Sequence, residues 1–136
     1  MSYDVCQDVA DLLEDEGFGM CGVDIWTMVQ YRLTGELRGI LIETTSPGDI
    51  PDALIQTDII PVSITVCKGD GDQGRSDTGN LSFRIFKALD LKTDFTVNGT
   101  DYMCIQATTS PYELERDGRY YRVMRFDVTR YYGGTN

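Results

Sequence analysis

The stretch IIPVSITVC, residues 59–67, decides the fold class of this 136-residue chain. Apolar side chains alternate along it with small or polar ones, and the apolar set that points one way is Ile60, Val62, Ile64 and Val66. Alternation with a period of two residues predicts a half-buried β-strand. Pro61 lacks the N–H group that a strand ladder needs, so we expect it at the start of this strand or at a sheet edge.

Two more strands are expected before this one, at residues 24–31 and 39–45, because both segments are rich in β-branched and aromatic residues. The turn at residues 32–38, which contains Gly35, predicts that the two strands pair as a hairpin. Residues 46–58 carry prolines and a glycine and are expected to form a loop.

A Gly/Asp loop at residues 68–74 and then a helix at residues 75–90 are expected after the central strand. One apolar face of this helix consists of Leu81, Ile85, Ala88 and Leu89. Phe83 and Phe86 fall on a different flank. A helix that is apolar on two flanks is deeply buried or covered by something outside the domain, so we expect deep burial, with a subunit contact as the alternative.

A second hairpin is expected from residues 94–98 and 101–109, because Asn98-Gly99 between them is typical of tight type I′ turns. Residues 110–118 are expected to form a loop that carries Tyr112 and Leu114.

The last strand is expected at residues 119–132, and its alternation directs three residues toward the core: Met124, Phe126 and Val128. The alternate set, which includes Arg119 and Arg125, is directed away from the core. Residues 133–136 are expected to be a frayed end.

A helix at residues 4–16, which Gly17 ends, is expected to open the chain. Its apolar residues recur at helical spacing on one face, at Val5, Val9, Leu12 and Leu13. Four aspartates follow the same spacing on the opposite side: Asp4, Asp8, Asp11 and Asp15. Such a stripe is usually a solvated face; the alternative is an electrostatic docking strip for a neighbouring subunit.

The order of these segments predicts an α+β fold in one domain spanning residues 1–136. We expect a mixed, mostly antiparallel sheet of five to six strands packed with two helices, in the order helix–β–β–β–helix–β–β–β.

The charge of the chain is unevenly placed. Residues 1–58 hold 12 acidic and 2 basic residues, whereas residues 59–136 hold 10 of each, so the whole net charge of -10 comes from the first part. Nucleic-acid binders need Lys and Arg to meet phosphates, so this balance disfavours that class. It favours a protein with an acidic face that meets a basic partner.

The sequence shows no catalytic or metal-binding constellation. Histidine is absent and the four cysteines are widely scattered, which disfavours a zinc site and histidine-dependent nucleophilic catalysis. We expect free, mostly buried thiols, with two disulfides as the alternative in an exported protein. The run Asp70–Gly74 resembles half of a calcium loop, but its twelfth position is Leu81 rather than Glu. The chain is therefore expected not to be an enzyme and to need no cofactor or metal.

Targeting signals are also lacking. No apolar run approaches the roughly 20 residues that span a bilayer. The first residues lack the basic start and apolar region of a signal peptide, so we expect synthesis in the cytosol and no membrane contact.

The order of segments resembles the tail terminator (minor capsid) proteins of long-tailed bacteriophages over residues 5–131. The resemblance is carried by the opening helix ending LLEDEGFG (residues 12–19), VDIW (23–26), IPVSITV (60–66), the helix before Leu89, and YMCIQA (102–107) with its Ser110-Pro111 loop. Asp117-Gly118-Arg119 before an alternating strand also fits. The chain departs from the family in its long acidic start, its four cysteines and its Asp/Gly loop at residues 68–74.

The resemblance implies a small α+β subunit in a homohexameric ring at the neck of the virion. Such a ring sits on the tail tube, ends its polymerisation and joins the tail to the head connector, and DNA passes through it. The expected partners are therefore the protein itself, the tail tube protein and the head completion protein, with assembly in the bacterial cytoplasm.

Specific residues are expected at these contacts. The aspartate stripe, Phe83 and Phe86, and Arg119 and Arg125 are the expected subunit interface. Tyr112 and Leu114 are the expected contact with the tube or the connector. Two alternatives stay open: another head–tail joining or tube protein, and a small cytosolic domain that binds a metal or ligand through its acidic residues.

Overall fold

Two helices and six strands make up the part of the chain that the computed structural model describes, residues 4–27, 37–44, 57–116 and 118–131. In chain order they are α1 (Val5–Asp15), β1 (Ile25–Thr27), β2 (Gly39–Glu43), β3 (Thr57–Cys67), α2 (Gly71–Leu89), β4 (Thr93–Val97), β5 (Thr100–Arg116) and β6 (Arg119–Tyr131). The strands form one mixed sheet in the order β1-β2-β3-β6-β5-β4. The predicted α+β fold is therefore confirmed, and the order of its helices and strands roughly matches the prediction.

The first two strands run parallel, so the predicted hairpin between them is wrong. The Ile40 N–H donates to the Asp24 carbonyl at 2.8 Å and draws the start of β1 against Gly39. A Cβ atom at Gly39, which has a φ of 123°, would lie 2.1 Å from that carbonyl oxygen, so this approach depends on glycine. Residue alternation reports which face a side chain takes but not the direction in which neighbouring strands run, and this is why the pairing was mispredicted.

The predicted central strand is confirmed as β3, which begins two residues earlier than expected, at Thr57. Its expected core set is buried and faces Met124, Phe126 and Val128 of β6. Pro61 lies beyond the stretch of β3 that pairs with β2, which starts at Ser63. On that side the Pro61 carbonyl accepts a hydrogen bond from the Thr44 hydroxyl at 2.6 Å. Among the described residues, the proline therefore occupies a locally open edge, as expected.

The predicted loop at residues 110–118 is instead the second half of β5, which pairs with β6 as far as Arg116. The register shifts between Ala107 and Thr109 and again between Thr109 and Tyr112. These irregularities accommodate Pro111, which cannot donate to the ladder. Proline predicts the end of a strand because it lacks the N–H group that the ladder needs. Here the long partner strand β6 pairs with β5 on both sides of Pro111.

The second helix begins at Gly71, four residues earlier than predicted, so most of the expected Gly/Asp loop is its first turn. Its buried residues are Gly74, Thr78, Ser82, Ile85 and Leu89. Ile85 and Leu89 confirm part of the predicted apolar face, but Leu81 and Ala88 are only half-buried. The first half of α2 packs closely through small residues, since a Cβ at Gly74 would lie 2.4 Å from the Gly69 backbone.

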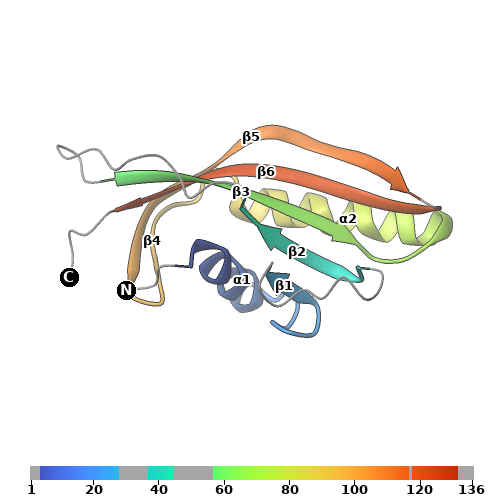
Figure 1. Ribbon diagram of the computed structural model, residues 1–136, viewed down its shortest axis with the longest axis horizontal. Helices are drawn as coiled ribbons and strands as arrows, with labels where there is room; N and C mark the ends of the chain where they lie inside the picture. Colours follow the sequence, from blue (N-terminus) through green and yellow to red (C-terminus); the bar gives the residue numbers. More distant parts are fainter. Residues whose placement is uncertain (1–3, 28–36, 45–56, 117, 132–136) are drawn as a thin grey trace.

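Both helices join the inward side chains of the sheet in one hydrophobic cluster. Figure 1 shows α1 below the strands, α2 behind them, and β5 and β6 side by side along the length of the molecule. The α1 face expected to be apolar is buried, at Val5, Val9, Leu12 and Leu13. Burying each of these side chains stabilises the fold by about 1.5–3 kcal/mol. Within the described residues, no helix is long and apolar enough to cross a membrane.

Candidate functional site

The aspartate stripe of α1 does not form one exposed strip. Asp4 is the N-cap of the helix and accepts a hydrogen bond from the Gln7 N–H at 3.1 Å. Asp15 is exposed, as expected of a solvated face, whereas Asp11 is half-buried. The Asp11 carboxylate accepts from the side-chain amides of Gln7 at 3.0 Å and Asn98 at 2.7 Å.

Asp8 is buried, with 1% of its surface exposed, so its predicted place in an exposed docking strip is wrong. Its carboxylate accepts hydrogen bonds from the Tyr102 hydroxyl and, at 2.9 Å, from the Asn98 amide. The β4–β5 hairpin covers this side of α1, a contact that helical spacing alone does not reveal. Burial, then the hydrogen bond to Asp8 and the charge of Asp8, raise the pKa of Tyr102.

A buried ion pair lies beside this contact and was not predicted. The Arg130 guanidinium donates to both carboxylate oxygens of Asp58, at 3.2 and 2.8 Å, and the two side chains are 9% and 5% exposed. The hydrogen bond to Asp58 is the main cause that raises the pKa of Arg130. Arg130 shares its strand face with Phe126 and Val128, so alternation placed an arginine in the core. We call Asp8, Tyr102, Asp58 and Arg130 the buried polar cluster.

The structure separates the two arginines that were expected at a subunit interface. Arg119 is 2% exposed and therefore not available at the surface of this chain, which corrects the prediction. It donates to the Leu37 carbonyl and to the Cys67 sulfur at 3.1 Å, and it lies 3.5 Å from the Asp70 carboxylate. Arg125 is exposed, as expected, and its guanidinium lies 6.0 Å from the centre of the Tyr112 ring.

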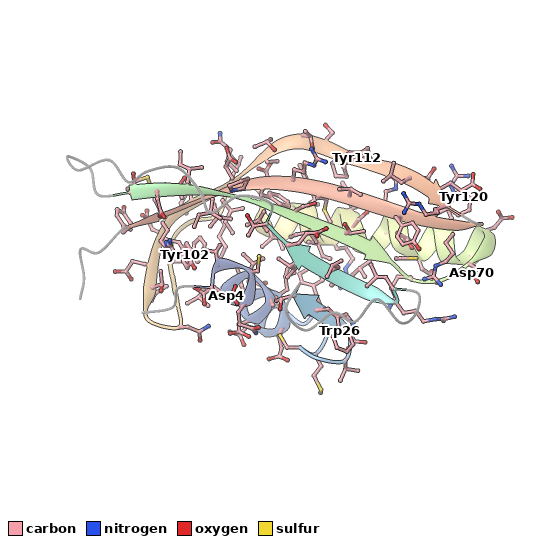
Figure 2. All side chains as sticks on the ribbon, in the orientation of Figure 1. Asp4, Trp26, Asp70, Tyr102, Tyr112 and Tyr120 are labelled. Carbon is pink, nitrogen blue, oxygen red and sulfur yellow. The ribbon has the colours of Figure 1, made fainter. Side chains whose placement is uncertain are left out.

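The far end of the β5–β6 hairpin holds the residues expected to contact the tube or connector. Figure 2 shows Tyr112 and Tyr120 toward this end, away from Tyr102. Tyr112 is half-buried, and Leu114 is 48% exposed. Glu113 accepts two hydrogen bonds from Arg75 of α2, at 2.7 and 2.8 Å, and the same guanidinium lies 4.7 Å from the centre of the Tyr120 ring.

The outer edge of β5 changes character along its length. The strand β4 pairs with it only as far as Cys104, and residues 90–92 extend the contact to Ala107. From Thr108 to Arg116, β6 is the strand that pairs with β5 within the described part of the chain. Thr108, Thr109, Ser110, Glu115 and Arg116 along this stretch are exposed. We call Thr108–Arg116 the open edge.

The two phenylalanines of α2 have different environments. Phe86 is half-buried, with its ring centre 5.9 Å from that of Phe126. Phe83 is 59% exposed, so the prediction of deep burial is wrong for this residue. Helical periodicity separates the flanks of α2, but only the packed structure shows that the sheet covers one of them.

The turn after α1 exposes two further apolar side chains, Met20 at 59% and Val23 at 60%. The Met20 carbonyl accepts from three successive backbone N–H groups, those of Val23, Asp24 and Ile25, and the Asp24 carboxylate accepts from the Met20 N–H. The turn is therefore internally braced. No signal in the sequence distinguished these two residues from core residues.

One group of described residues places possible metal ligands together: Asp11, Glu14 and Cys21, whose ligand atoms lie within 4.8 Å of one another. The Cys21 N–H donates to Glu14 at 2.7 Å, and its thiol lies 3.6 Å from Asp11. Burial and both carboxylates raise the pKa of the Cys21 thiol to about 11, which opposes the thiolate that a soft metal needs. All four cysteines are free thiols. The half calcium loop is absent as a loop, because Gly71–Gly74 is helical.

Two cavities border these surfaces. One of about 410 Å³ lies between β3 and the hairpin, and its lining includes Glu43, Ser63 and Arg125. The other, of about 330 Å³, lies between Phe18 and α2, and its lining includes Asp77 and Arg84. Each brings acidic and basic side chains together, so neither selects a ligand by charge.

No protein-family model matches this chain, and no curated protein sequence matches it.

Proposed function

We propose that this protein is a structural subunit of a phage neck. Copies of the chain assemble into a ring of about six on the top of the tail, end the growth of the tail tube and join the tail to the head connector. Two things support the proposal: the resemblance of the segments to tail terminator proteins, and the α+β fold, which is the fold that the resemblance implies.

The observation that carries the proposal is the open edge of β5. A strand that pairs on one side presents unpaired backbone N–H and C=O groups, which readily pair with another chain unless they are covered. The exposed Leu114 and the half-buried Tyr112 belong to the same stretch. A protein whose work is contact with other proteins has a use for such an edge, and this supports a structural role rather than an enzymatic one.

Another head–tail joining or tube protein is the second candidate, since the open edge favours that role equally. The partners that follow from the proposal are the protein itself, the tail tube protein and the head completion protein. Its site is then the virion neck, with DNA passing through the ring.

The first experiment measures self-assembly. Light scattering over a concentration series, with negative-stain images of the same samples, should give closed rings of about six subunits with a central hole. A second arm adds the protein to polymerising tail tube protein and measures tube length. A terminator yields short tubes with a capped end, whereas tubes of unchanged length with an uncapped end would refute the proposal.

A variant separates the tube contact from the ring. Replacing Tyr112 and Leu114 with Ser should leave folding intact but abolish capping of tubes and joining to heads. The matched control replaces Ile59 of β3 and Tyr131 of β6 with Ser. These residues are 39% and 36% exposed and lie at the end of the sheet away from Tyr112 and Leu114. If tails of normal length still join heads with the first variant, these two residues are not the contact.

A further inference from the structure

The outward side of α2 carries an exposed apolar and basic surface. Phe83 is 59% exposed, and the Lys87 ammonium lies 5.4 Å from the centre of its ring. Just beyond the end of α2, Leu91 is 69% exposed, the largest exposed fraction among the apolar side chains of the described chain. We call Phe83, Lys87 and Leu91 the α2 face. Phe83 and Lys87 lie opposite the buried residues Ile85 and Leu89 of the helix, so they point away from the sheet.

Leu91 is also strained. Its φ is 65°, in the left-handed region that leucine rarely adopts and that glycine or asparagine adopts more easily. Its N–H donates to the Ile105 carbonyl at 2.9 Å, which fixes this conformation. The chain therefore holds a strained leucine with its side chain largely in water. An outlier of this kind marks a position where the side chain serves something other than the stability of the single chain.

A second surface of the chain complements the α2 face in charge and matches it in apolar character. The braced turn exposes Met20 and Val23, and the exposed Asp15 precedes it at the end of α1. We call Asp15, Met20 and Val23 the acidic turn. It belongs to residues 1–58, which carry the whole net charge of -10, so a partner for it must be basic.

We infer that the α2 face of one copy packs against the acidic turn of a second copy, with Phe83 and Leu91 on Met20 and Val23 and with Lys87 facing Asp15. This rests on the proposed self-assembly and names the surfaces that carry it. Apolar contacts supply most of the affinity, and the opposite charges select the partner and its orientation.

The arrangement within one chain supports this pairing. Within one chain, the residues that follow α1 and α2 already attract each other, because Lys92 lies 3.9 Å from Glu16. The Arg84 guanidinium of α2 also lies 5.4 Å from the centre of the Phe18 ring, which follows α1. Figure 1 shows α2 behind the strands and α1 below them. These two contacts place the end of α1 next to α2, so the two surfaces are neighbours on one chain. A contact between different surfaces of identical chains leaves one copy with a free acidic turn and the other with a free α2 face, so the contact repeats until the assembly closes.

The test is an exchange of charge. Lys87→Glu and Asp15→Lys should each raise the concentration for half-assembly about tenfold, because like charges then meet. A one-to-one mixture of the two variants should assemble as the wild type does, since each altered surface then meets its opposite. The matched control is Lys68→Glu, which changes the net charge as Lys87→Glu does at an exposed residue outside the two surfaces and should assemble normally.

Leu91→Asn provides an independent arm. It relieves the strain and should raise Tm by about 4 °C, while weakening assembly about tenfold. Ile59→Asn removes an exposed apolar side chain elsewhere and should neither raise Tm nor weaken assembly. A merely structural Leu91 would change Tm without changing assembly.

The outcomes distinguish this inference from the proposed function. If the mixture of Lys87→Glu and Asp15→Lys assembles no better than either variant alone, or if Leu91→Asn assembles normally, the named contact is wrong and ring formation by other surfaces stands. Wild-type protein that stays monomeric at every concentration also overturns the contact, whereas the proposed function is then judged by the tube-length measurement.

Discussion

The two ends of the β5–β6 hairpin use the same pair of strands in opposite ways. At the near end, which is the end away from Arg116 and Arg119, Tyr102 and Arg130 pair across the strands and belong to the buried polar cluster. At the far end, Glu113 pairs across from Arg122 and makes its ion pair with Arg75 at the surface. Figure 2 places Tyr102 and Tyr120 at these two ends.

The difference shows that one end of the hairpin stabilises the fold, whereas the other end is free to contact other proteins. At the near end β4 and α1 cover the strands, so each polar group there is desolvated and must keep its partner. At the far end water and salt screen the charges, so the ion pair contributes little to stability. The near end therefore anchors the fold, and the open edge can change partners at small cost.

The largest expected effect is at the buried ion pair. Arg130→Met leaves the Asp58 carboxylate buried without its partner and should lower the free energy of unfolding by about 3–5 kcal/mol. Urea denaturation at pH 7 measures this. The double variant Asp58→Leu with Arg130→Met removes both charges and should be more stable than the single variant; a double variant of equal or lower stability would contradict the desolvation argument.

The next largest effect is at Asp8. Asp8→Ala leaves the Tyr102 hydroxyl and one N–H of Asn98 without their acceptor and should cost about 2–3 kcal/mol in the same assay. Asp15→Ala, the matched change at the exposed position of the stripe, should fall within about 0.5 kcal/mol of wild type. Equal losses in the two variants would mean that burial does not distinguish these aspartates.

A smaller effect is expected at alkaline pH. Burial, with the charges of Asp4 and Glu43, raises the pKa of the Cys6 thiol from 9.0 to about 11. The folded state thus holds this proton more tightly than the unfolded state does. The resulting stability is fully present below about pH 9 and is lost as pH rises toward about 11.

Urea midpoints in reducing buffer across this pH range measure the loss. Tyr102, whose pKa is also raised, adds to it at the upper end of the range. Cys6→Ala should flatten the decline, and its difference from wild type should be constant at pH 7 and 8. A parallel decline in both proteins would assign the pH dependence to other groups.

The smallest effect is expected at the far end of the hairpin. Glu113→Gln removes the ion pair with Arg75, whose side chain is 52% exposed, and should change Tm by about 1 °C or less. Arg75 holds the pKa of Glu113 below its usual value, so the little stability it provides is lost as pH falls through the acidic range. The difference should vanish in high salt. A loss as large as that of Asp8→Ala would remove the contrast between the two ends.

Much of the fold could be predicted from local pattern. The alternation in β3 and β6 and the apolar face of α1 report which side chains face the core, because burial of one face imposes the period. Asn98-Gly99 predicted its turn, since few dipeptides adopt that backbone. Pro111 was a misleading signal, because the bulges in β5 and the length of β6 overcome its effect.

The candidate surfaces were harder to predict. Asp8 and Asp15 share one helical stripe, and Arg119 and Arg125 share one strand face, yet each pair divides into a buried and an exposed member. Periodicity predicts the face of a helix or strand on which a side chain lies, but not whether another element covers that face. Contacts between segments distant in the chain, such as Asn98 with Asp8, decide that.

The sequence by itself determined the order of helices and strands, the inward faces of β3, β6 and α1, and the acidic first part of the chain, because these depend on neighbouring residues. The tertiary structure alone decided the parallel pairing of β1 with β2, the burial of Asp8 and Arg119, and the exposure of Phe83 and Leu91. These depend on which distant segments exclude water from a side chain. Desolvation, which sets the cost of each polar group and the value of each apolar one, is a property of the packed molecule and not of the local sequence.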